Sequence, residues 1–285
     1  MKILTEALPY IKSFKNKVFV IKYGGSIMSN EEAKKAFIED VVLFKLVGIN
    51  IVIVHGGGPE ISGMLKRLNI QTKFESGLRV TDKDTMEIVE MILSGKVNKD
   101  ITSKLSAHGI KAVGISGRDS ELITAKKKYV EEGGKKIDIG YVGDVESVKR
   151  DIIVDLIDKE YIPVISPVGC DKDGQSYNIN ADYVAGAISS VLGAEKLILL
   201  TDVNGVYRDI KDPSSFISEI KKGEIDDMIS SNIIQGGMIP KMECCRDTIE
   251  SGTQNIHLIN GNVEHSLLLE IFTKEGIGTM VKGDE

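Results

Sequence analysis

The sequence predicts an α/β protein with a largely parallel sheet. Its strand candidates are short apolar runs rich in β-branched residues, of the kind found where helices cover both faces of a sheet. These runs alternate with helical patterns, and no linker or low-complexity segment interrupts the alternation. Two lobes on one continuous sheet fit this pattern better than two independent domains.

The stretch from Val18 to Ser26 predicts a buried strand that ends in a charged turn. Val18 to Ile21 is continuously apolar, and Lys22 follows where ligands of open α/β sheets bind. Gly24 and Gly25 lack side chains, so their N–H groups can approach an anion such as phosphate. A buried strand with an extended lysine and an ordinary glycine turn explains this stretch alone equally well.

A second strand, glycine turn and helix start follow. Asn30 is expected to cap a helix that runs to about Val47, and residues 51–54 form the next buried strand. The strand continues into His55-Gly56-Gly57-Gly58-Pro59 and then a helix. Three glycines in a row indicate an anion site here, because they are costly unless the backbone bends sharply or meets a ligand.

The remaining elements follow the same alternation. The segment from Leu122 to Val148 alternates with glycine breaks, which predicts β-hairpins at a sheet edge, and Lys126, Lys127 and Lys128 would lie at a solvated hairpin tip. Further helices are expected at residues 82–93, 96–108 and 152–159, and two more are expected to begin within residues 178–182 and 236–241. Strands are expected at residues 112–115, 162–165, 197–200, 256–259 and 279–281.

Residues 2–14 predict an amphipathic helix that precedes the first strand. Its apolar side chains are at helical spacing, and Pro9 within it predicts a kink. A helix this short is marginal alone and needs a surface on its own domain or on another subunit. The apolar positions are Leu4, Ala7, Leu8, Ile11 and Phe14.

Composition excludes several classes of protein. The formal charge of −6, with no sustained basic stripe, argues against nonspecific nucleic-acid binding. No apolar run approaches the roughly 20 residues of a membrane helix, and no signal-peptide core is present, so a cytoplasmic protein is expected. The 3 cysteines and 4 histidines form neither a disulfide framework nor a metal-ligand spacing.

The set of glycine turns, two lysines and one aspartate suits phosphoryl transfer. Negative charge spreads over the transferring group, so catalysis needs N–H groups, lysines and magnesium to stabilise it rather than a protein nucleophile. The chain has neither a G-x-x-x-x-G-K-[ST] loop nor G-x-G-x-x-G, which excludes P-loop and dinucleotide-binding proteins by those signatures.

Taken together, six motifs resemble those of the acetylglutamate kinases, a branch of the amino acid kinase family. They occur in the order of that family and span nearly the whole chain: 21–25, 55–59, 77–81 (Gly-Leu-Arg-Val-Thr), 178–182, 201–205 and 236–241. The resemblance implies a single three-layer αβα sandwich. It also implies an N-terminal helix over residues 1–16, an acyl-substrate half over 17–170 and an ATP-binding half over 171–285.

The resemblance further implies ATP-dependent phosphorylation of the side-chain carboxylate of N-acetyl-L-glutamate. Lys22 and Lys241 would stabilise the transferring phosphoryl group, and Asp182 would hold both ammonium groups. ATP phosphates and water would mainly hold Mg²⁺, since no carboxylate cage is present. The implied substrate residues are Gly57, Gly58, Arg79 and Asn178, and the implied nucleotide residues are Gly24, Gly25, Thr201, Asp202, Gly205 and Gln235.

Two alternatives stay open beside this interpretation. One is another member of the family, such as a carbamate, aspartate, glutamate or uridylate kinase, although Arg79 within its motif favours the acetylglutamate branch. The other is a catalytically silent amino-acid sensor, which would have no physical need for Lys22, Asp182 and Lys241 together.

The N-terminal helix resembles the extension of arginine-inhibited members of the family. Those enzymes are hexamers, formed as trimers of dimers through interlaced kinked helices. The resemblance therefore implies a homo-hexamer that L-arginine inhibits. The positions that match the arginine site are Tyr10, His257, Glu270 and Gly276.

Overall fold

The computed structural model describes residues 2–284, except for the side chains of residues 2–5, Ser26 and Glu132. Two compact units divide the chain: the first comprises residues 1–52 and 189–285, and the second comprises 53–188. The chain therefore passes into the second unit within strand β2 (Asn50–His55) and returns within helix α7 (Ala181–Leu192). These units differ from the contiguous halves 17–170 and 171–285, and the assignment of a substrate to each half stays a prediction.

The first unit is built on five strands in the order β14-β16-β15-β11-β1. Their bounds are β1 Val18–Tyr23, β11 Lys196–Thr201, β14 Glu219–Lys221, β15 Asn255–Asn260 and β16 Thr279–Lys282. The pairs β1/β11, β11/β15 and β14/β16 are parallel, and only β15/β16 is antiparallel. The sheet is therefore mostly parallel, as the buried apolar runs predict.

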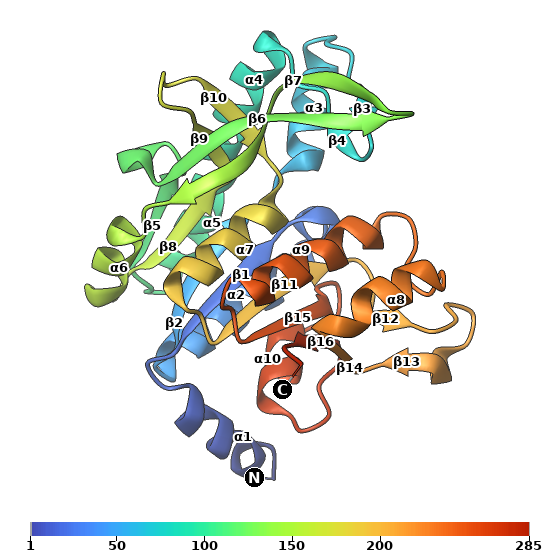
Figure 1. Cartoon of the computed structure of the whole chain (residues 1–285). Coiled ribbons are helices and arrows are strands. Elements are labelled where there is room, and N and C mark those ends of the chain that lie inside the picture. The colour runs from blue at the N-terminus through green and yellow to red at the C-terminus, as the bar shows by residue number, and fades with distance from the viewer. Residues whose placement is uncertain (1, 285) are drawn as a thin grey trace. The chain divides into compact units, whose positions relative to one another are not determined.

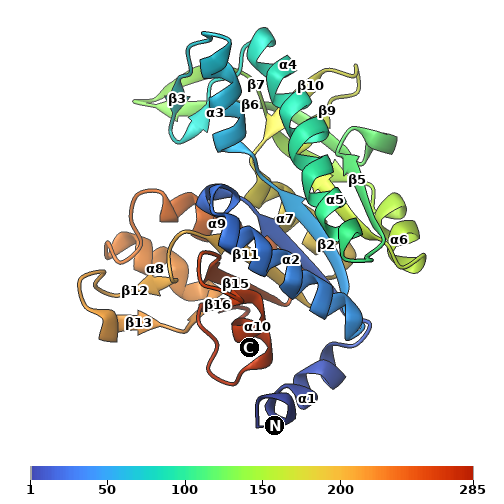
Figure 2. The same cartoon turned by 180° about the vertical axis from the view of Figure 1, so that it is seen from behind.

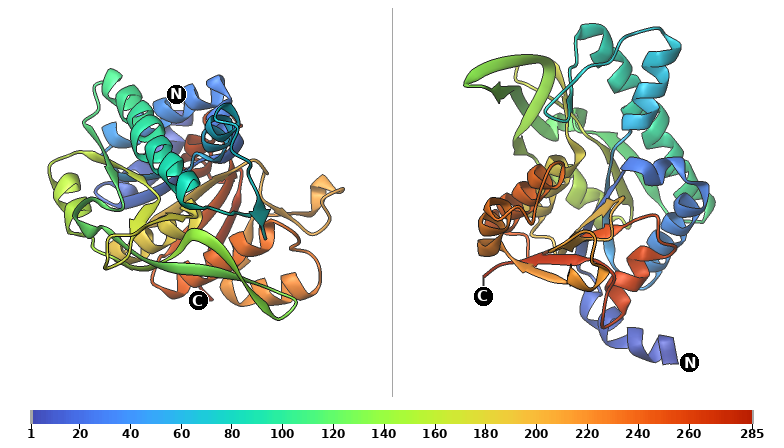
Figure 3. Two further views of the ribbon diagram at one scale, coloured as in Figure 1. Left: turned by 90° about the horizontal axis from the view of Figure 1, so that it is seen from above. Right: turned by 90° about the vertical axis from the view of Figure 1, so that its right-hand side faces the viewer.

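Helices cover both faces of this sheet (Figures 1 and 2). Helix α9 (Met238–Glu250) lies on one face, and α2 (Glu31–Leu46) and α10 (Ser266–Phe272) lie on the other, which Figure 3 shows edge-on in its right-hand view. Phe19 of β1, Phe44 of α2 and Phe272 of α10 pack edge to face in the layer between. This is the expected αβα layering. The smaller elements are η1 Gly25–Ser29, β12 Val206–Tyr207, η4 Pro213–Ser215, β13 Phe216–Ile217, η5 Lys222–Glu224 and α8 Ile225–Ser230.

Several predicted helix starts are confirmed by their caps. The side chain of Asn30 accepts hydrogen bonds from the N–H groups of Glu32 and Ala33, and Asp82 accepts one from Thr85 at the start of α4 (Lys83–Glu90). The expected helix α1 spans Lys2–Phe14 with Pro9 inside it. Ala7 is buried but Leu8 is 56% exposed, and the side chain of Leu4 lies outside the described residues. Part of the predicted apolar face is therefore uncovered in the single chain.

The second unit combines strands β2, β8 (Ile162–Ser166) and β5 (Ala112–Ser116), which are mutually parallel, with a helical layer. Helix α5 (Asn98–Ala107) packs on β5 and β8. A π-helical segment, η2 (Met91–Val97), joins α4 to α5, so the two helices predicted separately form one continuous run. The other elements are α3 Gly58–Arg67, β3 Phe74–Glu75, β4 Leu78–Arg79, η3 Asp119–Glu121 and α6 Asp151–Asp158.

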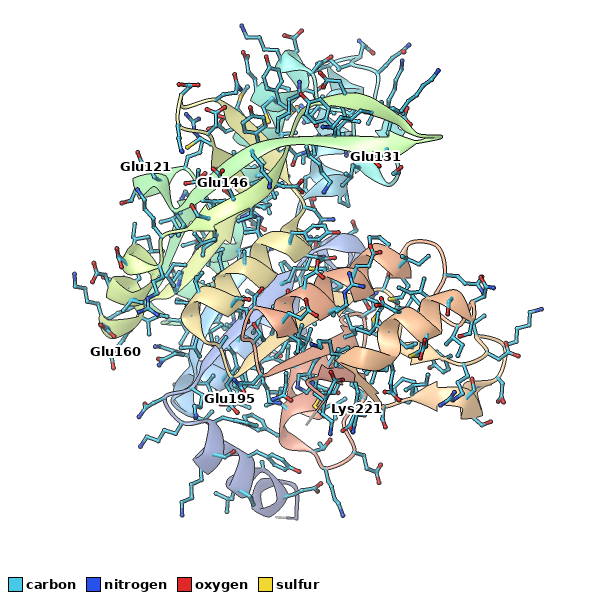
Figure 4. All side chains as sticks on the ribbon, in the orientation of Figure 1. Glu121, Glu131, Glu146, Glu160, Glu195 and Lys221 are labelled. Atoms are coloured by element: carbon cyan, nitrogen blue, oxygen red, sulfur yellow. The ribbon has the colours of Figure 1, made fainter. Side chains whose placement is uncertain are left out.

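The prediction of hairpins at a sheet edge is wrong in its placement. Residues 122–148 form one long hairpin, β6 (Ile123–Glu132) and β7 (Lys135–Val148), which joins β9 (Val168–Cys170) and β10 (Ser176–Ile179) in a separate four-stranded closed sheet. The hairpin tip lies near Glu131 (Figure 4). Lys127 and Lys128 lie along the strand rather than at the tip and pair with Asp138 and Asp144. Cross-strand carboxylates therefore neutralise the middle of the lysine cluster.

No helix among residues 2–284 combines the length and the apolar character that crossing a membrane requires. The three cysteines are free thiols, as the sequence predicts.

Candidate active site

In the first unit, the glycine turn after β1 lies beside the end of β11. Lys22 is partly buried near the carboxyl end of β1, and its register partner on the parallel neighbour is Leu199, two residues before Thr201. Gly24 is buried, and Gly25 begins the short helix η1. The carboxyl ends of these two strands thus share one edge of the sheet, which is where ligands of such sheets bind.

A cavity of about 870 Å³ opens at the loops that follow β11. This volume suits a nucleotide-sized ligand. Three of the predicted nucleotide residues line it, namely Asp202, Gly205 and Gln235. Thr201 is not in the lining, but its hydroxyl donates to the carbonyl of Val203 (2.8 Å) and so shapes the loop.

The sequence prediction did not name most of the lining residues, and two asparagines among them interact with each other. Asn204 and Asn260 lie in the cavity wall, and the side-chain amide of Asn260 donates to the Oδ1 of Asn204 at 2.7 Å. Asn204 belongs to the Thr201–Gly205 motif, which was a usable signal. Asn260 comes directly at the end of a buried strand, so its position was the only signal.

The three proposed catalytic residues lie in different units. Lys241 is in the first turn of α9 and, like Lys22, belongs to the first unit, whereas Asp182 is the second residue of α7 in the second unit. Asp182 is 8% exposed, and its N–H donates to the Oδ1 of Asn180 at 2.8 Å. A polar side chain therefore holds the backbone at this helix start. The roles of the three side chains stay predictions.

In the second unit, Arg79 is buried against the glycine turn that follows β2. Its Nη2 donates to the carbonyl of Gly58 (3.2 Å) and to the hydroxyl of Ser62 (2.7 Å), and its guanidinium carbon lies 4.8 Å from the centre of the Phe74 ring. Burial lowers the pKa of Arg79, but an arginine stays charged at neutral pH. Composition alone would have placed this side chain at the surface, and Ser62 was missed.

The Nη1 of Arg79 is buried and has no hydrogen-bond acceptor among the residues that the structure describes. A buried donor without a partner is costly, and a charged one more so. A carboxylate bound beside the glycine turn would satisfy it.

Asn178 of β10 joins Arg79 through Thr81. The Asn178 amide donates to the Thr81 hydroxyl at 3.4 Å, and that hydroxyl donates to the carbonyl of Arg79 at 2.8 Å. The structure therefore brings together two of the predicted substrate residues from segments about a hundred positions apart. Thr81 belongs to the Gly77–Thr81 motif but had no role assigned.

Gly57 and Gly58 start helix α3. Gly57 is its N-cap, and a Cβ there would lie 2.6 Å from the Cδ2 of Leu93, so a larger residue would have to push that side chain aside. The first N–H groups of a helix have no intrahelical acceptor and attract anions. The turn and the Arg79 guanidinium thus lie side by side, an arrangement suited to an anion.

His257, Glu270 and Gly276, predicted from the resemblance to an arginine site, also lie together in the first unit. The Nδ1 of His257 lies 2.5 Å from the Oε1 of Glu270, whose Oε2 accepts from the N–H groups of Ile277 (2.7 Å) and Gly278 (2.9 Å). Gly276 lies against the same carboxylate. The lysine of this cluster, Lys196, was missed: its Nζ is 2.8 Å from the Nε2 of His257.

Burial lowers the pKa of both His257 and Lys196. Although burial opposes ionisation of Glu270, its hydrogen bonds from His257 and the backbone lower its pKa. A neutral imidazole therefore links an ammonium group to a carboxylate. Tyr10 contacts this cluster only indirectly. Its ring stacks on the ring of Phe14, and the Nζ of Lys196 lies over the Phe14 ring, 5.2 Å from its centre.

Among residues 2–284, no group of three or more histidine, cysteine, aspartate or glutamate side chains could hold a metal ion. If Mg²⁺ enters, phosphate oxygens and water must supply most of its ligands.

The family model of the amino acid kinases matches residues 17–260. The chain belongs to the amino acid kinase family. It is 54% identical to the acetylglutamate kinase of Kosmotoga olearia, in an alignment that covers 100% of this chain and 98% of that protein. It is 53% identical to the acetylglutamate kinase of Heliobacterium modesticaldum, with 98% of this chain and 96% of that protein covered. This membership makes it a kinase.

Solved structures agree on the amino acid kinase fold. An N-acetylglutamate synthase from Neisseria gonorrhoeae complexed with coenzyme A and N-acetyl-glutamate superposes with a TM-score of 0.86 at 22% identity, and this chain covers 63% of its length. Carbamate kinase from Giardia lamblia bound to AMP-PNP gives a TM-score of 0.67 at 14% identity, with 99% of that chain covered. At these identities the likeness concerns the fold alone.

Proposed function

We propose that this protein transfers the γ-phosphoryl group of ATP to the side-chain carboxylate of N-acetyl-L-glutamate, as a step of arginine biosynthesis. The observation that carries the proposal is Arg79, a buried cation held beside the glycine turn of α3, whose Nη1 has no acceptor within the described part of the chain. Relatives named acetylglutamate kinase, at 54% identity over the whole chain, support the choice of acceptor. We also propose the cytoplasm, where ATP is used for biosynthesis, as its location.

The acceptor would bind in the second unit by its charges and its amide. Arg79 would take a carboxylate of acetylglutamate through Nη1, and the amide of Asn178, held by Thr81, would contact the acetamido group. The N–H groups of Gly57 and Gly58 would bind the anionic oxygens of the acceptor. One substrate carrying two carboxylates and an amide uses all of these groups.

ATP would bind in the first unit, in the cavity of about 870 Å³ that Asp202, Gly205 and Gln235 help to line. Gly24 and Gly25, after β1, would contribute N–H groups to the phosphates. Mg²⁺, when bound through the phosphates, would neutralise part of their charge.

For the transfer itself, we assign charge stabilisation to Lys22 and Lys241. Negative charge develops on the bridging and equatorial oxygens, and two ammonium groups lower its energy without forming a covalent intermediate. We assign to Asp182 the role of orienting these ammonium groups in the reacting complex.

The test of this function is an ADP-release assay with several acceptors. N-acetyl-L-glutamate is compared with carbamate, L-aspartate, L-glutamate and UMP at equal concentrations, each with and without Mg²⁺. ADP release should depend on acetylglutamate and Mg²⁺. Faster release with another acceptor would assign the chain to a different branch of the family, and no release with any acceptor would favour a silent sensor.

We further propose that L-arginine inhibits the enzyme by binding at His257, Glu270 and Gly276, and that the active form is a hexamer. The carboxylate of Glu270, which Gly276 leaves room to approach, would pair with the guanidinium of arginine. The chain Tyr10–Phe14–Lys196–His257 would connect that site to α1. The exposed Leu8 of α1 supports a helix that packs on another subunit.

A further inference from the structure

His55 is completely buried at the end of β2, immediately before the glycine turn, and has no role in the site as described so far. Its Nδ1 lies 2.8 Å from the carbonyl oxygen of Gly56. Because a carbonyl only accepts, Nδ1 must carry the proton. Burial lowers the pKa of His55 to about 4, so the ring is neutral and its Nε2 is an acceptor.

Asn98 of α5 fixes the same tautomer from the other side of the ring. Its Nδ2 lies 3.2 Å from the Nε2 of His55 and 2.8 Å from the carbonyl oxygen of Val164. Both contacts need an N–H donor at that position, so the side-chain amide has one orientation. The Nζ of Lys99 donates to the Oδ1 of Asn98 at 3.0 Å, which favours the same orientation.

Gly114 makes room for this network. Its backbone carbonyl accepts from the Nζ of Lys99 at 2.7 Å, and a Cβ at this position would overlap the Oδ1 of Asn98. A side chain on β5 would therefore push the buried amide away from His55. Two polar groups thus contact the imidazole directly, the Gly56 carbonyl and the Asn98 amide. Lys99 and the Val164 carbonyl of β8 hold that amide in turn.

The consequence appears in the glycine turn itself, where three successive carbonyls are held in place. The Gly56 carbonyl accepts from His55, the Gly57 carbonyl from the N–H of Ile61 (3.0 Å), and the Gly58 carbonyl from Arg79. The described peptide bonds are all trans, so each N–H points opposite to the carbonyl of its own peptide group. Holding the Gly56 carbonyl inward therefore turns the N–H of Gly57 outward.

We propose that His55 and Asn98 are positioning residues, which set the direction of the Gly57 N–H toward the acceptor substrate. This inference rests on the proposed role of Gly57 and Gly58 in binding acetylglutamate. Neither side chain reaches the substrate. They act by fixing one peptide group whose N–H would otherwise rotate, and an imidazole held in one tautomer keeps that peptide group fixed over the working pH range.

Two substitutions at one position separate positioning from packing. In His55→Asn the side-chain amide nitrogen takes the place of Nδ1, so the bond to the Gly56 carbonyl is kept and the contact with Asn98 is lost. In His55→Gln the side-chain amide takes the place of Nε2, so Asn98 keeps its partner and the Gly56 carbonyl loses its donor. His108→Asn and His108→Gln, at an exposed histidine of the same unit, are the matched controls.

The KM of each substrate and kcat are measured for the four variants, together with their melting temperatures. H55Q should raise the KM of acetylglutamate or lower kcat by about 10- to 100-fold, while the KM of ATP changes less than about threefold. H55N should raise the KM of acetylglutamate by only about threefold, because it keeps the bond to the Gly56 carbonyl and loses the contact with Asn98, and the KM of ATP should stay unchanged. Both variants should melt at a lower temperature, since each leaves unfilled space in the core.

Equal kinetics in H55N and H55Q would show that His55 serves packing alone and would overturn the proposal. If H55Q does not fold, Lys99→Met serves as a second test. It removes the hydrogen bond from Lys99 to the Asn98 amide without changing the core, because Lys99 is exposed. A selective rise of about threefold in the KM of acetylglutamate supports the proposal, and an unchanged KM overturns it. Failure of the proposed function is distinguishable, since wild-type protein would then show no acetylglutamate-dependent ADP release.

Discussion

Single residues carry the proposed chemistry, and Arg79 is the one whose environment is most informative. It is 8% exposed, it touches Ser62 and Gly58 through one nitrogen, and its other terminal nitrogen has no acceptor among the described residues. A buried arginine with one half engaged and the other open is arranged for a planar anion. A lysine could supply the charge, but its single nitrogen could not both hold Gly58 and Ser62 and keep a separate donor for the anion.

Arg79→Lys should therefore raise the KM of acetylglutamate by about 10- to 100-fold and leave the KM of ATP nearly unchanged, because one ammonium nitrogen replaces a guanidinium that is anchored through Nη2 and offers Nη1 to the acceptor. Steady-state kinetics with each substrate varied in turn give both constants, and Arg67→Lys at the end of α3 is the control. A fall in ATP affinity instead would move Arg79 to the nucleotide site.

Lys22→Ala and Lys241→Ala should each lower kcat on the order of 100- to 1,000-fold without loss of folded structure, because both ammonium groups would act on charge that develops only during transfer. Initial rates at saturating substrates give kcat, and circular dichroism checks the fold. Lys35→Ala, at an exposed position of α2, should behave as wild type. Wild-type turnover in either variant would show that the replaced lysine takes no part in the reaction.

At the scale of elements, a contact between the buried Asp40 of helix α2 and the partly exposed His265, the N-cap of α10, connects these two helices of the first unit. The Nδ1 of His265 lies 2.7 Å from the Oδ1 of Asp40, which is 1% exposed and also accepts from the backbone of Leu267 and Leu268. Burial raises the pKa of Asp40 to about 6, despite its bond to His265, and that bond raises the pKa of His265. The side chain of Asp40 thus stabilises the N-terminus of α10 from another helix.

The sign of the pH dependence follows from both pKa values being raised on folding. The folded protein binds protons more tightly than the unfolded chain, so this pair stabilises at low pH and its contribution is lost as pH rises. For Asp40 the loss occurs between pH 3.8 and about 6, and for His265 it continues above pH 6.5.

Compared with Asp40→Asn, wild-type protein should therefore lose about 2 kcal/mol of unfolding free energy between pH 4.5 and pH 7.5. Denaturant unfolding of both proteins at several pH values gives the difference between their unfolding free energies. The effects of the other carboxylates, which both proteins share, cancel in this difference. Glu32→Gln, at an exposed position of the same helix, is the control. A difference that stays constant with pH would show that the pair does not titrate in this range.

At the scale of the whole molecule, α1 is the element that the proposed chemistry does not use. Its Leu8 is 56% exposed while Ala7 is buried, and it contacts α10, which carries Glu270. A helix that packs partly on its own unit and partly remains apolar at the surface is suited to join another subunit. Its contact with α10 would also let it respond if arginine binds at His257 and Glu270 as proposed.

Deletion of residues 1–14 should convert a hexamer into an active dimer that arginine no longer inhibits, because the helix would supply both the contact between dimers and Tyr10. Light scattering gives the mass, and ADP release with increasing arginine gives the inhibition. Glu270→Gln, in the full chain, should keep the hexamer and weaken inhibition alone. A full chain that is a dimer, or that ignores millimolar arginine, would assign the helix another purpose.

The fold was largely predictable because its determinants are local. Val18–Ile21 and the other β-branched runs form strands, and Asn30 and Asp82 cap helices through bonds that span only two or three residues. The long hairpin at 122–148 was recognised but misplaced, since its pairing with β9 and β10 depends on segments that are distant in the sequence.

The sequence by itself determined the class, the glycine turns and the identity of the candidate site residues, because turn chemistry and motif spacing are properties of short segments. Only the tertiary structure decided which polar groups meet. In the sequence His55 is only one residue of a motif, and its contact with Asn98, which Val164 holds in turn, is visible only in the structure. Likewise, nothing in the sequence marks Lys196 as a partner of His257. The partner of a buried polar group is chosen by the packing of distant elements, since burial makes an unpaired group costly and the chain must fold to pair it.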